Sequence, residues 1–168
     1  MAPILDERSL EFISRDPAQT RRLGARLGRL ARGGQVICLE GVLGAGKTVL
    51  AQGIGAGWGA VTPLASPTFV LAREHRRPTG AQRLIHLDLY RLRDAQEAWS
   101  LGVQDWMEDP QAVVVVEWPE RALEILPAER LWVRLELTDE TQRRLLFTAN
   151  GDSYRAMLRE FRRDAFGV

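Results

Sequence analysis

Residues 35–48 read QVICLEGVLGAGKT, and this stretch decides the fold. Its first six residues form a short apolar run of the kind found in a buried central strand. Its last eight match the pattern G-x-x-x-x-G-K-[S/T] in full, a match that arises by chance in roughly 0.5% of chains of this length. They are Gly41, Val42, Leu43, Gly44, Ala45, Gly46, Lys47 and Thr48. A buried strand that leads directly into such a loop predicts a phosphate-binding site.

The residue types of this loop suit a polyphosphate. Glycines allow the backbone to wrap closely around phosphate oxygens, so that consecutive N–H groups point inward. A helix is expected over 49–55, and its positive N-terminal end would face the same oxygens. Lys47 would place a compact charge on the β- and γ-phosphates, and Thr48 would offer its hydroxyl to Mg²⁺. We therefore expect ATP and Mg²⁺ as the cofactors of residues 41–48.

Lys47 is also the one lysine in the chain, because the other 22 of the 23 basic residues are arginine. A GC-rich genome that replaces lysine codons explains the general bias but not the position of the exception. A planar guanidinium group would fit this loop badly, which explains why a lysine is retained at position 47. The same count sets GTPases aside, because their guanine-reading motif N/T-K-x-D needs a lysine outside the loop.

Length and composition indicate a single domain spanning residues 1–168. The chain has 45% apolar residues, a formal charge of +1 and one cysteine, Cys38. A protein that grips nucleic acid by its own surface is usually far more basic. One cysteine allows no internal disulfide and fits a reducing compartment. With no apolar run of 18 residues and no signal peptide, we expect a cytoplasmic protein that neither enters nor spans a membrane. Helicases and motor ATPases need a far longer chain.

Strand-like and helix-like segments alternate along the rest of the sequence. Asp16 before Pro17 predicts the start of a helix that ends at Gly33, and Asp94 with Glu97 predicts a short helix that ends near Gly102. A last amphipathic helix is expected over 153–166. Strands are expected at 9–14 (an edge strand), 35–40, 66–73, 83–90 and 112–118, with an antiparallel hairpin formed by 131–137 and 143–148. This order predicts a three-layer α/β P-loop NTPase fold whose mixed, partly parallel sheet has antiparallel additions.

Two acidic residues stand where an apolar strand is expected to leave the sheet. Asp88 ends the segment RLIHLD, and Glu117 ends the segment AVVVVE. This is the usual place of the acidic residue that organises Mg²⁺ and the attacking water in such folds. A solvated residue at a strand end is the alternative for each, although it is improbable that both lack a role. Thr48, Asp88 and Glu117 are thus the candidate metal residues, and Asp88, Glu117 and Lys47 the candidate catalytic residues.

Five motifs together resemble the bacterial TsaE family, also called YjeE. They are GVLGAGKT at 41–48, SPTF at 66–69, HLDLYR at 86–91, the pair Leu101-Gly102 and EWPE at 117–120. Their order and spacing agree from about Thr20 to Arg121, and the tail beyond carries no matching motif. The resemblance implies a small ATPase needed to make threonylcarbamoyladenosine in tRNA. It also implies that the chain acts with two partner proteins, TsaB and TsaD, which carry out the transfer.

The resemblance further implies roles for individual residues. Lys47 and Thr48 would hold the triphosphate and Mg²⁺, Asp88 would belong to the metal and water shell, and Glu117 would be the second essential carboxylate. Trp118 is likewise implicated and counts among the candidate nucleotide-binding residues. The family's mobile switch segment, which senses the γ-phosphate, corresponds to Ser66, Pro67, Thr68 and Phe69. The family commonly has Asp where this chain has Val42, so the carboxylate of that Asp has no counterpart in this loop.

Other residues leave alternatives open. Trp118 could cap a strand by packing, stack on the nucleotide or contact a partner. His86 is interpreted as a sheet side chain that alternation places on the same face as Asp88, and no zinc site is expected because no second His or Cys stands at ligand spacing. Arginine clusters at 73–77 and 155–163 are either solvated faces or contacts to an acidic partner or to the tRNA backbone. A small-molecule kinase and a non-hydrolysing nucleotide sensor are the rival functions.

Overall fold

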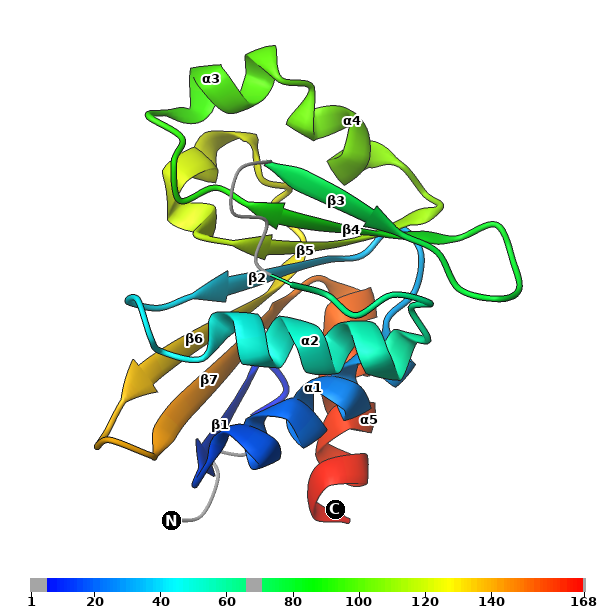
Figure 1. Ribbon diagram of the computed structural model, residues 1–168. Helices are drawn as coiled ribbons and strands as arrows, with labels where there is room; N and C mark the ends of the chain where they lie inside the picture. Colours follow the sequence, from blue (N-terminus) through cyan, green and yellow to red (C-terminus); the bar gives the residue numbers. More distant parts are fainter. Residues whose placement is uncertain (1–5, 66–70, 168) are drawn as a thin grey trace.

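The computed structural model describes residues 6–65 and 71–167, and within them the chain forms a seven-stranded sheet with helices on both faces (Figure 1). Across the sheet the strands follow the order β1-β7-β6-β2-β5-β4-β3. Their bounds are β1 Ser9–Ser14, β2 Val36–Glu40, β3 Ala72–His75, β4 Arg83–Asp88, β5 Ala112–Glu117, β6 Arg130–Leu137 and β7 Arg143–Asn150. The helices are α1 Pro17–Leu30, α2 Lys47–Trp58, α3 Ala95–Ser100, α4 Val103–Glu108, the 3₁₀-helix η1 Pro119–Ile125 and α5 Asp152–Phe166.

The centre of the sheet is parallel and its margins are antiparallel. The neighbouring strands β6, β2, β5 and β4 run in one direction. The strand β3 pairs antiparallel with β4, β7 with β6, and β1 with β7. β5 reads AVVVVE and is buried throughout, as expected of a central strand that is covered on both faces. The predicted mixed sheet with antiparallel additions is confirmed, as is the edge position of β1.

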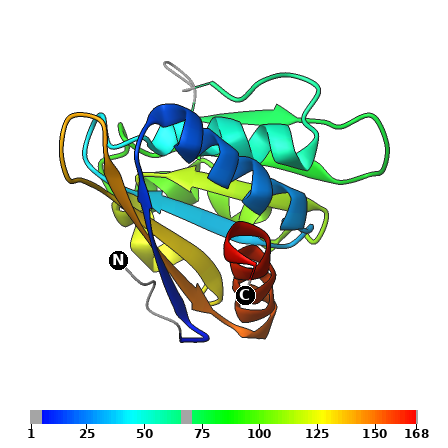
Figure 2. The ribbon, with the colours of Figure 1, turned by 90° about the horizontal axis from the view of Figure 1, so that it is seen from below.

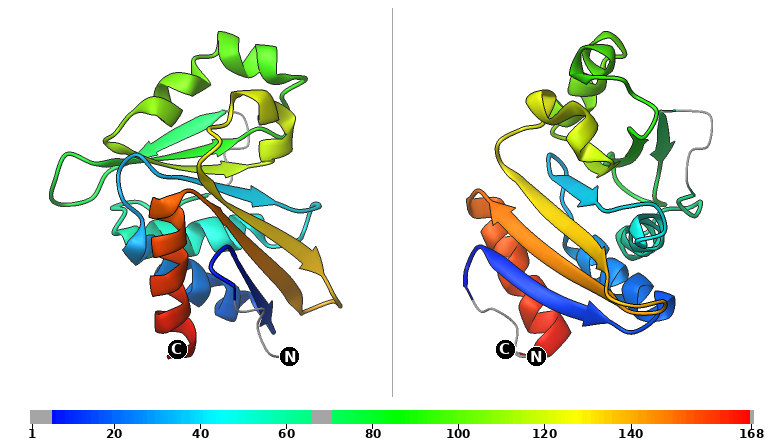
Figure 3. Two further views of the ribbon diagram at one scale, coloured as in Figure 1. Left: turned by 180° about the vertical axis from the view of Figure 1, so that it is seen from behind. Right: turned by 90° about the vertical axis from the view of Figure 1, so that its left-hand side faces the viewer.

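Two hydrophobic clusters, one on each face, hold the helices to the sheet. Helices α1, α2 and α5 pack on one face, in a cluster that includes Leu27, Leu50 and Phe161. Helices α3, α4 and η1 pack on the other face, where Ala98 and Met107 contribute. Figure 2 shows α1 running alongside α2, and Figure 3 shows the twisted sheet between the two groups of helices. The predicted three-layer α/β arrangement is therefore confirmed.

Most elements lie where the sequence predicts them, and the strand ends differ for local reasons. β4 stops at Asp88 because the Asp88 carboxylate accepts a hydrogen bond from the Tyr90 amide, at 3.0 Å, and the chain turns. β5 stops at Glu117 because Trp118 adopts a left-handed backbone with φ +60°. Of the strand expected at 66–73, residues 66–70 lie outside the described residues, and β3 starts only at Ala72. α4 and η1 have no predicted counterpart, because so few residues show no clear periodicity.

Helices α1 and α2 approach each other through glycines. A Cβ atom built on Gly28 of α1 would lie 2.0 Å from the carbonyl oxygen of Ile54, and one on Gly57 of α2 would lie 1.9 Å from that of Ala25. No real side chain could occupy either position without movement of the backbone. The two helices therefore pack backbone to backbone, which fixes α2 tightly over the sheet.

The longest helices of the described residues are α5, with 15 residues, and α1, with 14. Over residues 6–65 and 71–167, none of the helices combines the length and the apolar character needed to cross a membrane.

Replacement of Gly28 by alanine tests the close packing of α1 on α2. In an ordinary helix interior this change stabilises by up to about 1 kcal/mol, because alanine has the higher helix propensity. Here the new methyl group would collide with the backbone of α2, so we expect Gly28→Ala to destabilise the fold by about 1–3 kcal/mol. Chemical denaturation measures the difference. Exposed Arg29 provides a control, since Arg29→Ala should stay within about 0.5 kcal/mol of the wild type. A Gly28→Ala protein as stable as the wild type would contradict the contact.

Candidate functional site

Residues 41–46 connect the end of β2 to the start of α2, at the edge of the sheet where the parallel strands end (Figures 1 and 3). Gly44 and Gly46 have φ values of +80° and +102°, which glycine adopts without the steric penalty of a side chain. The Ala45 amide donates to the Val42 carbonyl oxygen at 3.0 Å and closes a turn. The sequence thus bends the chain sharply between a buried strand and a helix.

The start of α2 is open to an anion. Gly46 precedes the first helical residue and has no side chain, so no side-chain hydrogen bond caps the first turn of α2. The first N–H groups of a helix have no intrahelical partner and carry a partial positive charge. Helix termini of this kind bind phosphate groups. The predicted loop therefore has the backbone geometry and the electrostatics that a phosphate group requires.

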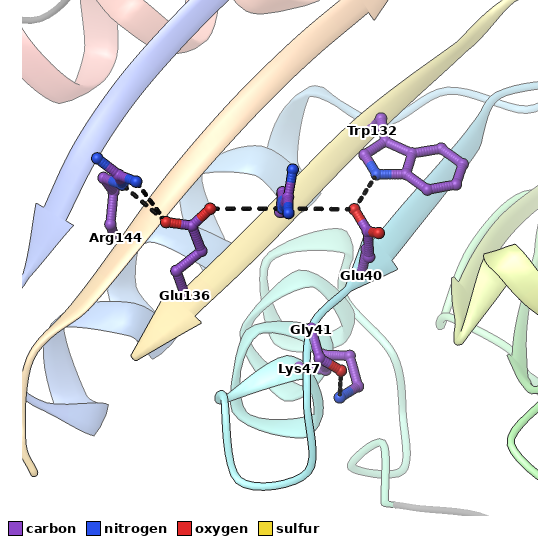
Figure 4. A network of polar contacts seen from close by, with 7 residues as sticks. Glu40, Gly41, Lys47, Trp132, Glu136 and Arg144 are labelled. Carbon is purple, nitrogen blue, oxygen red and sulfur yellow. Dashed lines mark hydrogen bonds and ion pairs between the residues drawn. The ribbon is translucent and has the colours of Figure 1, made fainter. Parts of the chain in front are cut away.

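Lys47 folds back over this loop. Its Nζ donates hydrogen bonds to the carbonyl oxygens of Gly41 and Val42, the latter at 2.9 Å, and Figure 4 shows the first of these contacts. Burial lowers the pKa of the Lys47 ammonium group, and three nearby carboxylates act in the opposite direction: those of Glu117, Glu120 and Asp88. The ammonium group thus lies among the acidic residues and within reach of the loop backbone.

The Glu117 carboxylate joins the loop helix to the neighbouring strand. The Thr48 hydroxyl donates to Glu117 Oε1 at 3.0 Å, and His86 Nε2 lies 2.6 Å from Glu117 Oε2. The Glu117 and His86 residues are buried, with relative exposures of 2% and 0%. Both carboxylate oxygens therefore have a partner, which holds the side chain in one orientation beneath the start of α2.

Asp88 lies beside Glu117. The two residues are register partners in the parallel pair formed by β4 and β5, and Leu39 of β2 is the partner of Glu117 on its other side. Alternation along parallel strands then places both carboxylates on the same face of the sheet. The structure thus brings together the loop lysine, the Thr48 hydroxyl and both predicted carboxylates, although they come from three separate elements.

Trp118 covers the edge of this cluster. Its backbone is left-handed, with φ +60° and ψ +48°, and among the described residues no other non-glycine residue has a positive φ. Such a conformation typically costs on the order of 1–3 kcal/mol, and it clusters at functional sites. The indole ring lies 4.2 Å from Lys47 Nζ and 4.8 Å from the centre of the Tyr90 ring. The strained backbone therefore directs the indole toward the lysine.

A network of charged and polar side chains fixes the end of β2 immediately before the loop (Figure 4). The Trp132 indole donates to Glu40 Oε1 at 3.0 Å, and Arg134 Nε lies 3.9 Å from the same oxygen. Arg134 also pairs with Glu136 at 3.4 Å, and Glu136 accepts hydrogen bonds from Arg144. Exposed ion pairs contribute little stability individually. Together, however, they connect Glu40, the last residue of β2 before the loop, to β6 and through β6 to β7.

Sequence reasoning missed two contacts of the site. Arg143 of β7 donates from Nη2 to the Gly44 carbonyl oxygen at 3.1 Å, and no local pattern could place this residue next to a loop 99 positions earlier. His86 was interpreted as a sheet side chain, which is correct, but its hydrogen bond to Glu117 was not foreseen. The signal was present, because alternation puts His86 on the face of Asp88.

The predicted switch residues Ser66, Pro67, Thr68 and Phe69 lie outside the described residues. In the described part of the chain, no group of three or more His, Cys, Asp and Glu side chains is arranged to hold a metal ion. A magnesium ion usually completes its shell with water and substrate phosphates rather than with protein ligands alone. A hydroxyl and two carboxylates beside a phosphate cradle fit that requirement.

Comparisons with known proteins identify relatives of the chain. The sequence model of the family described as "Threonylcarbamoyl adenosine biosynthesis protein TsaE" matches residues 14–145. A protein of Mycobacterium tuberculosis named tRNA threonylcarbamoyladenosine biosynthesis protein TsaE is 46% identical over 133 residues, which cover 75% of this chain and 78% of the relative. A protein of the same name from Bacillus subtilis is 33% identical over 156 residues, covering 93% and 96%.

Structural similarity extends over nearly the whole chain. The crystal structure of YdiB from Bacillus subtilis superposes with a TM-score of 0.77 at 29% sequence identity. The alignment covers 94% of this chain and 97% of YdiB. Coverage this high includes at least part of the 15-residue helix α5, although the family model ends at residue 145.

Removal of the Lys47 ammonium group tests the site directly. A charge-assisted hydrogen bond contributes up to about 3 kcal/mol, and the lysine would make at least one to phosphate. We therefore expect Lys47→Ala to weaken binding of Mg²⁺–ATP by about 100-fold or more, measured by titration calorimetry. Arg159→Ala removes one positive charge from α5 and should leave the affinity unchanged. Equal affinities for wild type and Lys47→Ala would show that the nucleotide does not use this loop.

Proposed function

The chain belongs to the TsaE family, and we propose that it is a Mg²⁺-dependent ATPase required for the threonylcarbamoyladenosine modification of tRNA. The observation that carries the ATPase proposal is the cluster at the start of α2. A glycine loop, an uncapped helix terminus, the buried Lys47 and the Thr48–Glu117 hydrogen bond converge there. The relatives are named for tRNA threonylcarbamoyladenosine biosynthesis, which supports the assignment to this modification.

In this proposal the nucleotide phosphates lie in the loop formed by residues 41–48. The loop amides and the first turn of α2 donate hydrogen bonds to phosphate oxygens. Lys47 exchanges its contacts with the carbonyl oxygens of Gly41 and Val42 for contacts with the β- and γ-phosphates. Trp118, whose ring lies next to Lys47, packs against the bound nucleotide.

Magnesium would be held by the Thr48 hydroxyl oxygen together with Asp88 and Glu117. When bound, the ion neutralises charge on the β- and γ-phosphates. The Thr48 hydroxyl donates its hydrogen to Glu117, and its oxygen lone pairs remain for a cation. Asp88 and Glu117 end neighbouring strands at the same level, so that their carboxylates would also orient the attacking water. Catalysis then consists of positioning and charge stabilisation, with little covalent chemistry from the protein.

The partners proposed for the chain are TsaB and TsaD, as the family resemblance implies. ATP binding or hydrolysis would reset the partner complex by moving the segment that contains residues 66–69. The protein would act in the cytoplasm, where it would meet these partners and tRNA. Hydrolysis by the protein alone is expected to be slow and to become faster in the presence of the partners.

Phosphate release tests the proposed activity. Purified protein with Mg²⁺ and ATP should release inorganic phosphate slowly, and addition of TsaB and TsaD should raise the rate by about 10-fold or more, a barrier change of about 1.4 kcal/mol. Lys47→Ala should abolish release under both conditions. Equal rates with and without partners would overturn the coupling, a phosphorylated small molecule would identify a kinase, and tight binding without turnover would identify a sensor.

Nucleoside analysis of tRNA tests the assignment to a pathway. Cells depleted of this protein should lose threonylcarbamoyladenosine from their tRNA, because the modification depends on the proposed ATPase. A wild-type copy should restore the nucleoside, whereas a Lys47→Ala copy should not. Unchanged threonylcarbamoyladenosine after depletion would refute the pathway and leave the ATPase proposal standing.

A further inference from the structure

We propose that His86 is a positioning residue: it holds the Glu117 carboxylate in the orientation that lets Glu117 fix the Thr48 hydroxyl for Mg²⁺. The inference rests on the proposed function, because it concerns the same nucleotide site. It assigns a role in Mg²⁺ binding to His86, which is not among the predicted metal or catalytic residues. The contact joins His86 Nε2 to Glu117 Oε2 at 2.6 Å.

The direction of this hydrogen bond follows from its neighbours. Glu117 Oε1 accepts from the Thr48 hydroxyl at 3.0 Å, and a carboxylate can only accept. His86 Nε2 must therefore carry the hydrogen and donate it to Oε2. The Glu117 carboxylate thus accepts a hydrogen bond at each oxygen, from Thr48 of helix α2 and from His86 of strand β4. With the His86 donor lost, Glu117 could rotate away from Thr48.

A histidine at this position has no structural reason apart from that contact. The ring is fully buried, and its neighbours on the same face of β4 and β5 are Leu84, Val113 and Val115. Its second nitrogen, Nδ1, is buried and has no hydrogen-bond partner within the described part of the chain. An apolar side chain would remove that unpaired nitrogen, but it would leave Glu117 Oε2 without its donor. The imidazole therefore serves the one hydrogen bond that it makes.

Two amide variants separate the hydrogen bond from the polarity of the side chain. In His86→Gln the amide nitrogen lies the same number of bonds from the backbone as Nε2 and reaches Glu117. In His86→Asn the amide lies at the level of Nδ1 and falls short by one carbon atom. Both replacements place a neutral amide in the same buried position. His75→Asn is the matched control, because His75 is buried on the same face of the neighbouring strand and bonds to Thr62 instead.

The readout is the Mg²⁺-dependent gain in affinity for a non-hydrolysable ATP analogue, measured by calorimetry with Mg²⁺ and with EDTA. Loss of such a supporting contact typically costs about 10- to 100-fold in metal affinity or activity. We expect His86→Asn to lose the Mg²⁺-dependent gain by about that factor, with the affinity in EDTA unchanged. His86→Gln and His75→Asn should keep the gain. The KM for Mg²⁺–ATP should rise in the same order of variants, because KM follows the dissociation constant when hydrolysis is slow.

Two results would overturn the inference: a full Mg²⁺-dependent gain in His86→Asn, or an equal loss in His86→Gln and His86→Asn. A purely structural role predicts the second result, because both amides would disturb packing alike. A wild type that binds the analogue with a Mg²⁺-dependent gain but never releases phosphate would contradict the proposed hydrolysis. The calorimetric comparison of the variants would still decide the role of His86.

Discussion

The structure depends on one electrostatic constraint: a helix must begin, without a side-chain cap, at the end of a buried parallel strand. Gly46 leaves the first amides of α2 open, and the glycine-rich turn keeps side chains away from them. Uncapped helix starts are unfavourable unless water or a ligand satisfies the amides. The surrounding fold accordingly holds α2 in place by two means. The buried strand β2 lies between β5 and β6, and glycines bring α1 and α2 into backbone contact.

Charge balance explains the composition of the cluster around that helix start. A buried ammonium group is costly without partners, and Lys47 has carbonyl oxygens and nearby carboxylates as partners. A buried carboxylate is equally costly, and Glu117 is satisfied at both oxygens by Thr48 and His86. Each of these groups supplies a hydrogen bond or an opposite charge to a neighbour in the cluster. Addition of a triphosphate and a divalent cation would change these pairings, so that the proposed nucleotide binding would be coupled to the positions of strand-end residues.

Much of this arrangement could be predicted from the sequence, because its signals are local. The loop motif, the strand before it and the acidic ends of RLIHLD and AVVVVE each show within a few residues. Two kinds of feature could not be predicted from the sequence: contacts between segments that are distant in the chain, and conformations of single residues that no sequence pattern signals. Arg143 reaches the loop only because β7 lies next to β6. The left-handed Trp118 has no residue signature, since asparagine or glycine would be expected there. The switch role of residues 66–69 remains a prediction, because these residues lie outside the described part of the chain.

A crystal structure with Mg²⁺ and a non-hydrolysable ATP analogue would test the central claim most directly. The account predicts that the β- and γ-phosphates lie against the amides of residues 44–48, with Lys47 Nζ moved from the Gly41 carbonyl to phosphate oxygen. It also predicts the metal ion next to the Thr48 hydroxyl, on the side of Asp88 and Glu117. Phosphates bound elsewhere, with Lys47 still on the loop carbonyls, would contradict it.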